Sequence, residues 1–473
     1  MYSNIELVYI YNKRKLREGM FKRKLVSLLM APIMVAGLIT GCAGGAASSE
    51  KEVTSSSVIS GSETGIKGDE ASATQAGAAD QTSAEANTAS ISDSSDGSDS
   101  SSAESSSDSG EGEVIQVKGI TERSDEMRDI SAKELVAEMT AGWNLGNTLE
   151  ATSASGLASE TSWGNPKVTK EQIDAVCEKG FDSIRIPITW GNHVGEAPDY
   201  TIDPEWMDRV EEVINYALDD GMYVLIDSHH EEFWRIPDAE HIDAVDAENI
   251  AIWKQVAERF KDYGDHLVFE GLNEPRTKGS AGEWSGGTPE EREYVNRLNK
   301  SFVDTVRATG GNNELRLLLV TTYADSSVPE ALKDIYIPDD KHIAVAIHAY
   351  TPYAFTYANG ESWELFKWDG SQNKEIFQLM IALDKNFLQK DIPVLLTEYG
   401  AVNKDENTEE VRKWAEVYVS KATDYGIPCF WWDNGIYDQQ GEKFAIFDRK
   451  NLTWYREEVV DTIIKESYSK ANG

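Results

Sequence analysis

Two glutamates at the ends of apolar segments are the strongest candidates for chemistry in this 473-residue chain. Glu274 lies in the run "LVFEGLNEP", between Asn273 and Pro275, and Glu398 lies in the run "IPVLLTEYG". If both runs are strands of one closed parallel sheet, their carboxyl groups meet at the same mouth. Two facing carboxyl groups, one protonated and one ionised, are the usual device for cleaving a glycosidic bond. We therefore predict that Glu274 and Glu398 form a catalytic pair.

The neighbouring residues indicate how the two roles divide. Arg185 and Tyr350 also follow apolar runs, and we expect both to hydrogen-bond Glu398. Such donors would lower the pKa of Glu398, which suits a nucleophile. No cation is evident beside Glu274, so we expect this group to stay protonated until it donates. Asn273 is expected to bind the sugar hydroxyl next to the reacting carbon.

The sequence "DSHHEE" contains two adjacent histidines, His229 and His230, and histidine and carboxylate side chains are common metal ligands. Adjacent side chains of an extended segment point in different directions, so the two rings rarely bind one ion. We expect no metal and no cofactor here. Which histidine lies closer to the reacting groups stays open.

Eight apolar runs of strand character alternate with amphipathic segments from Val114 onward. The runs cover residues 142–148, 181–188, 222–230, 266–274, 315–322, 342–350, 392–400 and 427–435. Segments between them, such as 204–221 and 289–311, have helical periodicity and end on glycine. Near-continuous apolar strands joined by helices predict an α/β fold, a (β/α)8 TIM barrel with its active site at the carboxyl ends of the strands. Glu270, in the fourth run, is expected to make structural hydrogen bonds.

The first part of the chain carries an export signal. From Met20 a basic cluster is followed by an apolar run and by Ile39-Thr40-Gly41-Cys42, which resembles a bacterial lipobox. We predict a signal peptide over residues 1–42, lipidation of Cys42, and Met1 or Met20 as the true start. The alternative is an ordinary signal peptide or an uncleaved anchor. The expected location is the cell surface, through Cys42, or the medium.

Residues 43–115 are rich in Ser, Ala and Asp and contain no aromatic residue. Such a composition cannot bury enough apolar surface to offset its ordering entropy, so we predict a disordered linker. The catalytic domain is predicted over residues 116–473. The net charge of −37 argues against nucleic acid or an anionic membrane surface as a partner. We expect a monomer that touches the membrane only through a lipid anchor.

The remaining cysteines and the tryptophans allow more limited predictions. Cys177 and Cys429 are expected to be buried free thiols, although export would permit a disulfide. Trp206, Trp253 and Trp414 fall at helical spacing and are expected to pack in the core. A second group of tryptophans falls in loops after the strands. Such side chains can stack on glucose rings, and we expect some of them to line a cleft. They are Trp163, Trp190, Trp234, Trp284, Trp363 and Trp368.

The ordered motifs "GWNLGNTLEA", "RIPITW", "DSHHEE", "LNEP", "IHAYTPYAF", "TEYGA" and "WWDNG" resemble those of glycoside hydrolase family 5. The resemblance is greatest to its bacterial endoglucanase and xyloglucanase branch and extends from about Ile130 to Ser467. It implies a retaining barrel glycosidase, with Glu274 as acid and base and Glu398 as nucleophile. By motif position it implies supporting roles for Arg185, His229, His230, Asn273, His348, Tyr350 and Trp432, and sugar contacts from Asn147 and Glu150.

The resemblance implies an endo-β-1,4-glucanase that acts on β-glucan polysaccharides or oligosaccharides. Xyloglucan, mixed-linkage glucan and mannan remain alternative substrates within the same family. A lipoprotein that binds oligosaccharides without cleaving them is the alternative from a different class. The intact carboxyl pair speaks against it, because a binding protein has no use for a matched acid and nucleophile.

Overall fold

The computed structural model describes residues 117–404 and 407–470. The predicted signal peptide, the lipobox with Cys42 and the predicted linker lie outside the described residues. Within the described ranges, no helix has the length and apolar character needed to cross a membrane.

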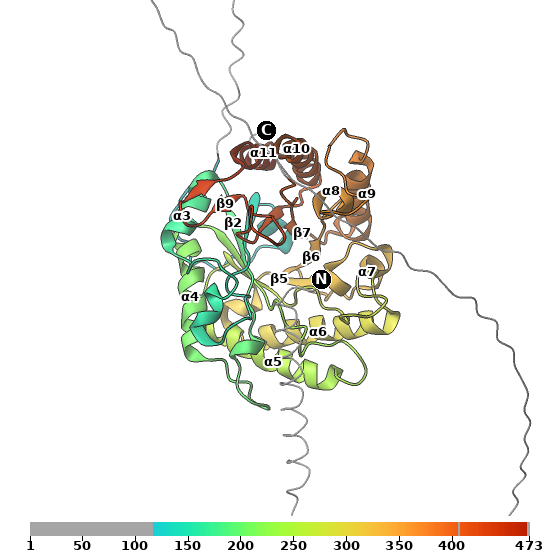
Figure 1. Cartoon of the computed structure of the whole chain (residues 1–473). Coiled ribbons are helices and arrows are strands. Elements are labelled where there is room, and N and C mark those ends of the chain that lie inside the picture. The colour runs from blue at the N-terminus through green and yellow to red at the C-terminus, as the bar shows by residue number, and fades with distance from the viewer. Residues whose placement is uncertain (1–116, 405–406, 471–473) are drawn as a thin grey trace, which may run out of the picture. The chain divides into compact units, whose positions relative to one another are not determined.

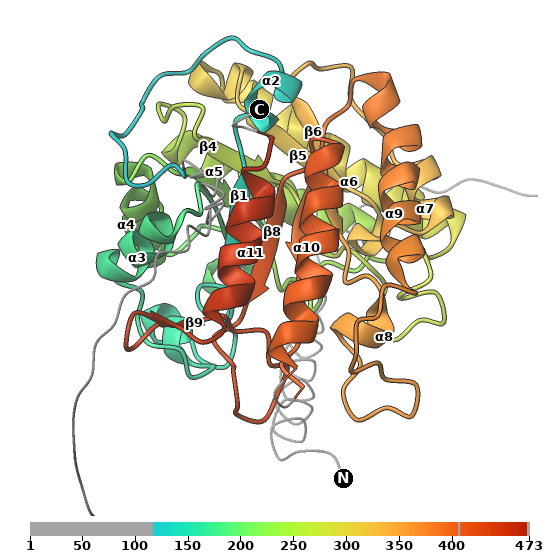
Figure 2. The same cartoon turned by 90° about the horizontal axis from the view of Figure 1, so that it is seen from above.

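Eight parallel strands close into a barrel in chain order, with β8 paired to β1, and helices surround them (Figures 1 and 2). The strands are β1 Ala141–Leu145, β2 Ser183–Ile186, β3 Tyr223–Ile226, β4 Leu267–Glu270, β5 Leu318–Thr321, β6 Ile343–His348, β7 Val394–Tyr399 and β8 Cys429–Asp433. Seven of them lie within the predicted apolar runs, and β1 begins one residue before its run, at Ala141. The predicted (β/α)8 barrel is confirmed.

Most helices cover the outside of the barrel, whereas α2 lies at its amino-terminal end and the four-residue α8 follows β6 at its carboxyl end. They are α2 Ala132–Val136, α3 Lys170–Lys179, α4 Pro204–Asp219, α5 Ile242–Arg259, α6 Pro289–Ala308, α7 Pro329–Asp334, α8 Tyr353–Thr356, α9 Asn373–Asn386, α10 Thr408–Asp424 and α11 Glu457–Ser467. A short antiparallel pair, β9 Phe447–Asp448 and β10 Thr453–Trp454, precedes α11. Figure 2 shows α10 and α11 side by side outside β8.

Local sequence signals explain where several helices begin and end. The Asp203 carboxylate accepts the Glu205 N–H at 3.0 Å and caps α4, which starts with Pro204. Thr288 and Glu291 form a capping box at the start of α6. Gly180 ends α3 with a φ of 113°, which only glycine adopts without strain.

The barrel interior changes character from one end to the other. Near the amino-terminal end it is apolar, and Leu135 and Val136 of α2 pack against inward side chains such as Leu225, Leu319 and Phe430. Near the carboxyl end the interior is polar. The buried polar side chains there include Asn144, Arg185, Glu270 and Thr397. The apolar end therefore anchors the barrel, and the polar end holds the candidate site.

Cys177 and Cys429 are buried free thiols, as predicted. Trp206, Trp253 and Trp414 are fully buried, so their predicted packing role is confirmed. Two of the loop tryptophans, Trp190 and Trp368, are also buried and do not line an open surface, whereas Trp284 and Trp363 are exposed.

Candidate active site

Arg185 on β2 is the buried centre of the site. Its Nε and Nη2 atoms donate to both carboxylate oxygens of Glu270, at 2.7 and 3.0 Å. Nη1 donates to Glu398 Oε1 at 2.9 Å, and Nη2 lies 2.9 Å from Asn273 Oδ1 and 2.7 Å from Asp227 Oδ2. One planar guanidinium thus fixes groups on or just after three strands, β3, β4 and β7. Glu270 has the structural hydrogen bonds predicted for it.

Glu398 is held at both carboxylate oxygens. Arg185 donates to Oε1, and the Tyr350 hydroxyl donates to Oε2 at 2.8 Å. Tyr350 follows β6, which pairs with β7, so the predicted reach from strand six to strand seven is present. The side chain of Glu398 is only 7% exposed.

Glu274 follows β4 in a left-handed backbone conformation, with a φ of 41°. Its Oε1 lies 3.1 Å from His348 Nδ1, and its Oε2 accepts a hydrogen bond from Arg276 Nη1 at 3.2 Å. The expectation that no cation stands beside Glu274 is therefore wrong. Arg276 is two residues further along, and its Nη1 also donates to the Glu274 carbonyl oxygen at 2.9 Å.

These contacts reverse the predicted order of the two pKa values in the free protein. Burial raises the pKa of Glu274, but the hydrogen bond and charge of His348 and the charge of Arg276 outweigh it and lower this pKa to about 2. Burial raises the pKa of Glu398, and His348, Arg185 and Tyr350 oppose this effect without overcoming it. The prediction that Glu398 has the depressed pKa and that Glu274 waits in the protonated form is thus wrong for this state.

His348, the last residue of β6, holds the proton that Glu274 lacks. Burial lowers the pKa of His348, but the charges of Glu398, Asp325 and Glu274 outweigh it and raise this pKa to about 9. His348 is therefore a cation at neutral pH. Its Nδ1 also lies 3.5 Å from Glu398 Oε2, between the two candidate catalytic groups.

His229 and His230 have different surroundings. His229 is buried, its Nδ1 lies 2.6 Å from Asp227 Oδ2, and its ring is parallel to the Trp432 ring at 5.8 Å. Burial, followed by the charges of His230 and Arg185, holds the pKa of His229 well below its usual value, so it is neutral. His230 is partly exposed and its Nδ1 lies 3.4 Å from Glu232 Oε1. The two rings are nearly perpendicular and face different partners.

The turn after β1, residues 146–150, lies next to Trp432. Asn147 has a φ of 56°, and its backbone N–H and that of Thr148 donate to the Glu150 carboxylate. Glu150 is fully buried, and burial raises its pKa to about 7. The structure therefore places Glu150 inside the turn, where it positions Asn147, and not on a surface where it would meet the predicted sugar.

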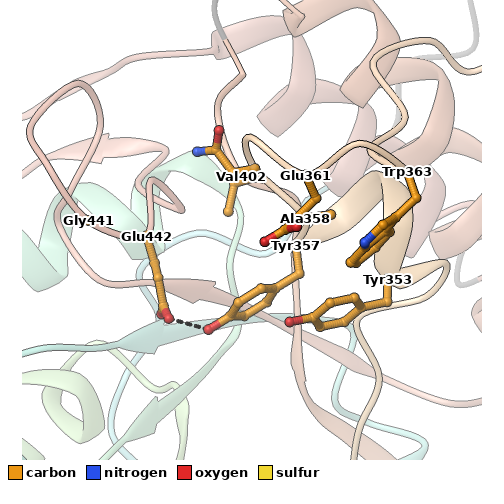
Figure 3. Close-up of a pocket in the computed structure, with 9 residues that line it drawn as sticks. Tyr353, Tyr357, Ala358, Glu361, Trp363, Val402, Gly441 and Glu442 are labelled. Carbon is orange, nitrogen blue, oxygen red and sulfur yellow. Dashed lines mark hydrogen bonds between the residues drawn. The ribbon is translucent and has the colours of Figure 1, made fainter. Parts of the chain in front are cut away.

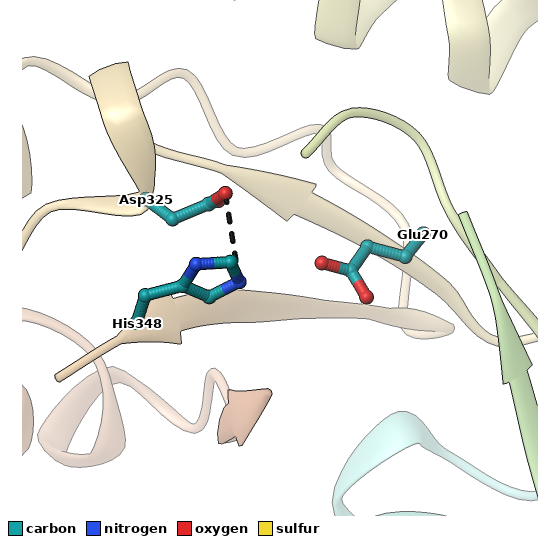
Figure 4. Close-up of side chains that lie close together, drawn as sticks. All are labelled: Glu270, Asp325 and His348. Atoms are coloured by element: carbon teal, nitrogen blue, oxygen red, sulfur yellow. Dashed lines mark ion pairs between the residues drawn. The ribbon is translucent and has the colours of Figure 1, made fainter. Parts of the chain in front are cut away.

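Two sets of side chains of the metal-binding type gather in the barrel mouth. Glu270, Asp325 and His348 form one set (Figure 4), and Glu274, His348 and Glu398 form the other; within each set the possible ligand atoms lie within 4.8 Å of one another. Both oxygens of Glu270 are bound to Arg185, and a protonated His348 has no free lone pair. These donor sets fit charged hydrogen bonds better than an ion.

A hollow of about 230 Å³ opens beside Tyr350. It is lined by Tyr353, Tyr357, Ala358, Asn359, Glu361, Trp363, Val402, Gly441 and Glu442 (Figure 3). The Tyr353 ring stacks on the rings of Tyr357 and Trp363, and the Tyr357 hydroxyl donates to Glu442. The Tyr357 ring also packs edge-on against Tyr350, which places this aromatic wall next to the partner of Glu398.

The barrel, its carboxyl pair and their supports match a known family. The family model for cellulase, glycosyl hydrolase family 5, matches residues 148–438, which is more than half of the chain. The chain belongs to glycosyl hydrolase family 5.

Known endoglucanases are similar to this chain over more than two thirds of its length. The chain is 65% identical over 346 residues to endoglucanase A of Ruminococcus albus, an alignment that covers 73% of this chain and 95% of that protein. A xyloglucan-specific endo-β-1,4-glucanase from a metagenomic library, crystallised with cellotriose, is 48% identical with a TM-score of 0.69, over 71% of this chain and 98% of that one. A broad-specificity endoglucanase from Ruminococcus champanellensis, with bound cellotriose, is 42% identical with a TM-score of 0.69, over 72% and 99% of the two chains.

The structure of this family 5 protein also brings in residues that the sequence did not single out. Asp227 fixes Arg185 and His229, and Arg276 contacts Glu274. Asp227 is the first residue of the motif "DSHHEE", and Arg276 directly follows the motif "LNEP". Asp325 lies in the loop after β5 and carried a weaker signal, since it is a single acid within "TTYADSS".

Proposed function

We propose that the protein is a retaining endo-β-1,4-glucanase in which Glu398 is the nucleophile and Glu274 the acid and base. The observation that carries this proposal is the separation of the two groups, since an oxygen of Glu274 lies within 4.8 Å of an oxygen of Glu398. Retaining enzymes have carboxyl groups about 5–5.5 Å apart, whereas inverting enzymes need about 6.5–9.5 Å to admit a water molecule.

Exposure and anchoring support this division of roles. The side chain of Glu274 is 21% exposed, compared with 7% for Glu398. A general acid and base must exchange its proton with water in every cycle, which suits the more exposed group. A nucleophile must be held in line with the anomeric carbon, which suits the group fixed by Arg185 and Tyr350.

The reaction proceeds in two displacements. Glu274, with a proton supplied by His348 at 3.1 Å, protonates the glycosidic oxygen while Glu398 attacks the anomeric carbon and forms a glycosyl-enzyme. Glu274 then takes a proton from water, which attacks the same carbon and releases Glu398. Arg185 has hydrogen-bond donors and no acceptor, so it binds the side-chain oxygen of Asn273. The side-chain N–H₂ of Asn273 is then left to bind the sugar hydroxyl next to the reacting carbon.

Exposed aromatic side chains on both sides of the carboxyl pair support cleavage inside a polymer. Trp284 stacks on Arg276, with 4.3 Å from the guanidinium carbon to the ring centre, and so stands beside Glu274. Trp363 and Tyr353 stand beyond Tyr350, on the side of Glu398. Sugar rings on both sides of the scissile bond can therefore stack on flat aromatic faces.

The proposal is tested by assaying the full chain on a panel of soluble polysaccharides. With carboxymethyl-cellulose, mixed-linkage glucan and xyloglucan, we expect viscosity to fall well before reducing ends accumulate. Glu398→Gln is expected to abolish both signals while still binding cello-oligosaccharides. Release of only short products without a fall in viscosity, or cleavage of mannan alone, would overturn the proposal.

Xyloglucan is the second candidate substrate. It is supported by the hollow lined by Tyr353, Trp363 and Glu442, which offers room and hydrogen-bonding groups beside the backbone of a glucan. It is also the substrate named for the 48% identical structure. A kcat/KM for xyloglucan above that for unbranched glucans would favour it.

For location, we propose a lipoprotein anchored at Cys42, with secretion as the alternative. The support is the lipobox-like sequence, which lies outside the described residues. We further propose that the catalytic domain acts as a monomer.

A further inference from the structure

The backbone of Glu274 is held from outside its own strand. Glu274 has a φ of 41°, and a positive φ at a residue other than glycine is strained and persists only where the surroundings hold it. The loop after β5 supplies these surroundings. Asp325 Oδ2 accepts the Glu274 N–H at 2.5 Å, and Ala324 N–H donates to Pro275 O at 3.0 Å. The next turn is also tied, since the Thr277 N–H donates to the Tyr323 hydroxyl at 3.0 Å.

Asp325 also reaches the side-chain partner of Glu274. Asp325 forms an ion pair with His348 (Figure 4), and its Oδ2 lies 3.7 Å from His348 Nε2. On the other side of the ring, His348 Nδ1 contacts Glu274 Oε1. One oxygen of Asp325 thus faces both the backbone of Glu274 and the far side of the imidazole. Asp325 is fully buried, and its other oxygen has no hydrogen-bond partner among the described residues.

The loop that carries Asp325 is itself strained, with φ values of 56° at Ala324 and 50° at Asp325. Neither residue is a glycine, so this conformation has a cost that the fold must offset. A buried acid without a full set of donors adds a second cost. Two such costs at one residue beside a catalytic group point to a role in the reaction.

We propose that Asp325 is a positioning residue that acts through Glu274. It fixes the turn that aims the Glu274 carboxyl group, and it forms an ion pair with His348 on the side of the imidazole opposite Glu274. Burial raises the pKa of Asp325, and the charge of His348 opposes that rise. This inference rests on the proposed role of Glu274 as acid and base.

Other charged groups face His348 as well, and they set the size of the expected effect. They are Glu270 on β4, Glu274 after β4, Glu398 on β7 and His229 after β3. Arg185 and Arg276 pair with Glu270 and Glu274. Glu274 and Glu398 remain when Asp325 is changed. Loss of Asp325 is therefore expected to lower the pKa of His348 in part and not to abolish its proton.

The test compares two variants of the full chain on two aryl β-cellobiosides. Asp325→Asn keeps an oxygen that accepts the Glu274 N–H but loses the charge, and Asp325→Ala loses both. A dinitrophenyl leaving group departs without a proton, whereas a phenyl leaving group needs one. We expect kcat/KM for the phenyl substrate to fall about tenfold in Asp325→Asn and further in Asp325→Ala, with less than about threefold loss for the dinitrophenyl substrate.

The pH profile gives a second readout that a merely structural role would not move. In Asp325→Asn the alkaline limb of kcat/KM for the phenyl substrate is expected to move to lower pH by about one unit, because the charge that raises the pKa of His348 is gone. Equal losses on both substrates, or wild-type rates and an unmoved limb, would overturn the inference. If Asp325→Ala does not fold, Asp325→Asn decides alone.

Glu274→Ala separates this inference from the proposed function. If the kcat/KM of Glu274→Ala falls only on the phenyl substrate while that of Asp325→Asn does not fall, the role of Asp325 is wrong and that of Glu274 stands. If Glu274→Ala itself shows no dependence on the leaving group, the acid and base assignment is wrong.

Discussion

Arg185 connects the structural and the reacting carboxyl groups, because one guanidinium binds Glu270 with two hydrogen bonds and Glu398 with one. The contact of Tyr350 with Glu398 was predictable, since consecutive strands of a barrel are neighbours. The order of the pKa values was not. It depends on the sum of burial and several charges, whose distances exist only in the folded chain.

Arg185→Lys tests this connection. Lysine keeps the charge but has one donor group where arginine has a planar fork, so it cannot hold Glu270 and Glu398 together. We expect kcat to fall about 100-fold or more with little change in the unfolding midpoint. Arg297→Lys is a matched control, since Arg297 makes a similar but exposed fork to Asp243 and Asp246. Near-normal turnover in Arg185→Lys would mean that any cation at this position suffices.

His348 makes the stability of the protein depend on pH. Its pKa is raised to about 9 from the ordinary 6.5, so its contribution is fully present below about pH 6.5 and is lost as pH rises through about 9. The free energy of unfolding of the wild type should therefore exceed that of His348→Gln most at pH 6, by up to about 3 kcal/mol, and the difference should shrink towards pH 10. Urea unfolding across this range measures it. A difference that stays constant with pH would exclude a charged His348.

At the scale of elements, the strands of the barrel were predictable as units, but their carboxyl ends were not. The run 222–230 reads as one strand, yet β3 ends at Ile226. The ladder stops there because the Asp227 carboxylate accepts the backbone N–H of Ile188 at 2.9 Å and also contacts His229. The backbone leaves the sheet at the residues whose side chains form the site. The apolar pattern continues past this point, so it does not show where the strand ends.

The short helix α2 closes the apolar end of the barrel. Loss of its contacts with the strands should therefore destabilise the whole fold. Leu135 is almost fully buried against inward side chains of the strands. We expect Leu135→Ala to cost about 2–5 kcal/mol in urea unfolding, with unchanged KM because the site lies at the opposite end. Lys133→Ala, on the exposed side of the same helix, should leave the unfolding midpoint unchanged. Equal effects of the two variants would contradict the packing role of α2.

For the whole molecule, family membership, the barrel and the carboxyl pair were all accessible from the ordered motifs. The hollow beside Tyr350 was not, because it is built from loops that are distant in sequence. Tyr353, Trp363 and Glu442 come from the segments after β6 and β8. Loop shape therefore decides which glucan fits, while the barrel decides the chemistry.

The predicted lipid anchor is also a property of the whole chain. Cys42→Ala should move activity from the membrane fraction to the medium, or leave an unprocessed precursor, because the thiol that would carry the lipid is gone. Fractionation and mass spectrometry of the mature N-terminus measure this. A wild-type protein that is wholly soluble with an unmodified N-terminus would exclude the lipoprotein.

The division of roles between Glu274 and Glu398 is tested most directly by the anomeric configuration of the azide product. With a dinitrophenyl β-cellobioside, Glu274→Ala should form the glycosyl-enzyme on Glu398, and azide should then displace Glu398 to give the β-glycosyl azide. Glu398→Ala has no nucleophile, so azide should attack in its place and give the α-glycosyl azide. An α product from Glu274→Ala together with a β product from Glu398→Ala would contradict the assignment.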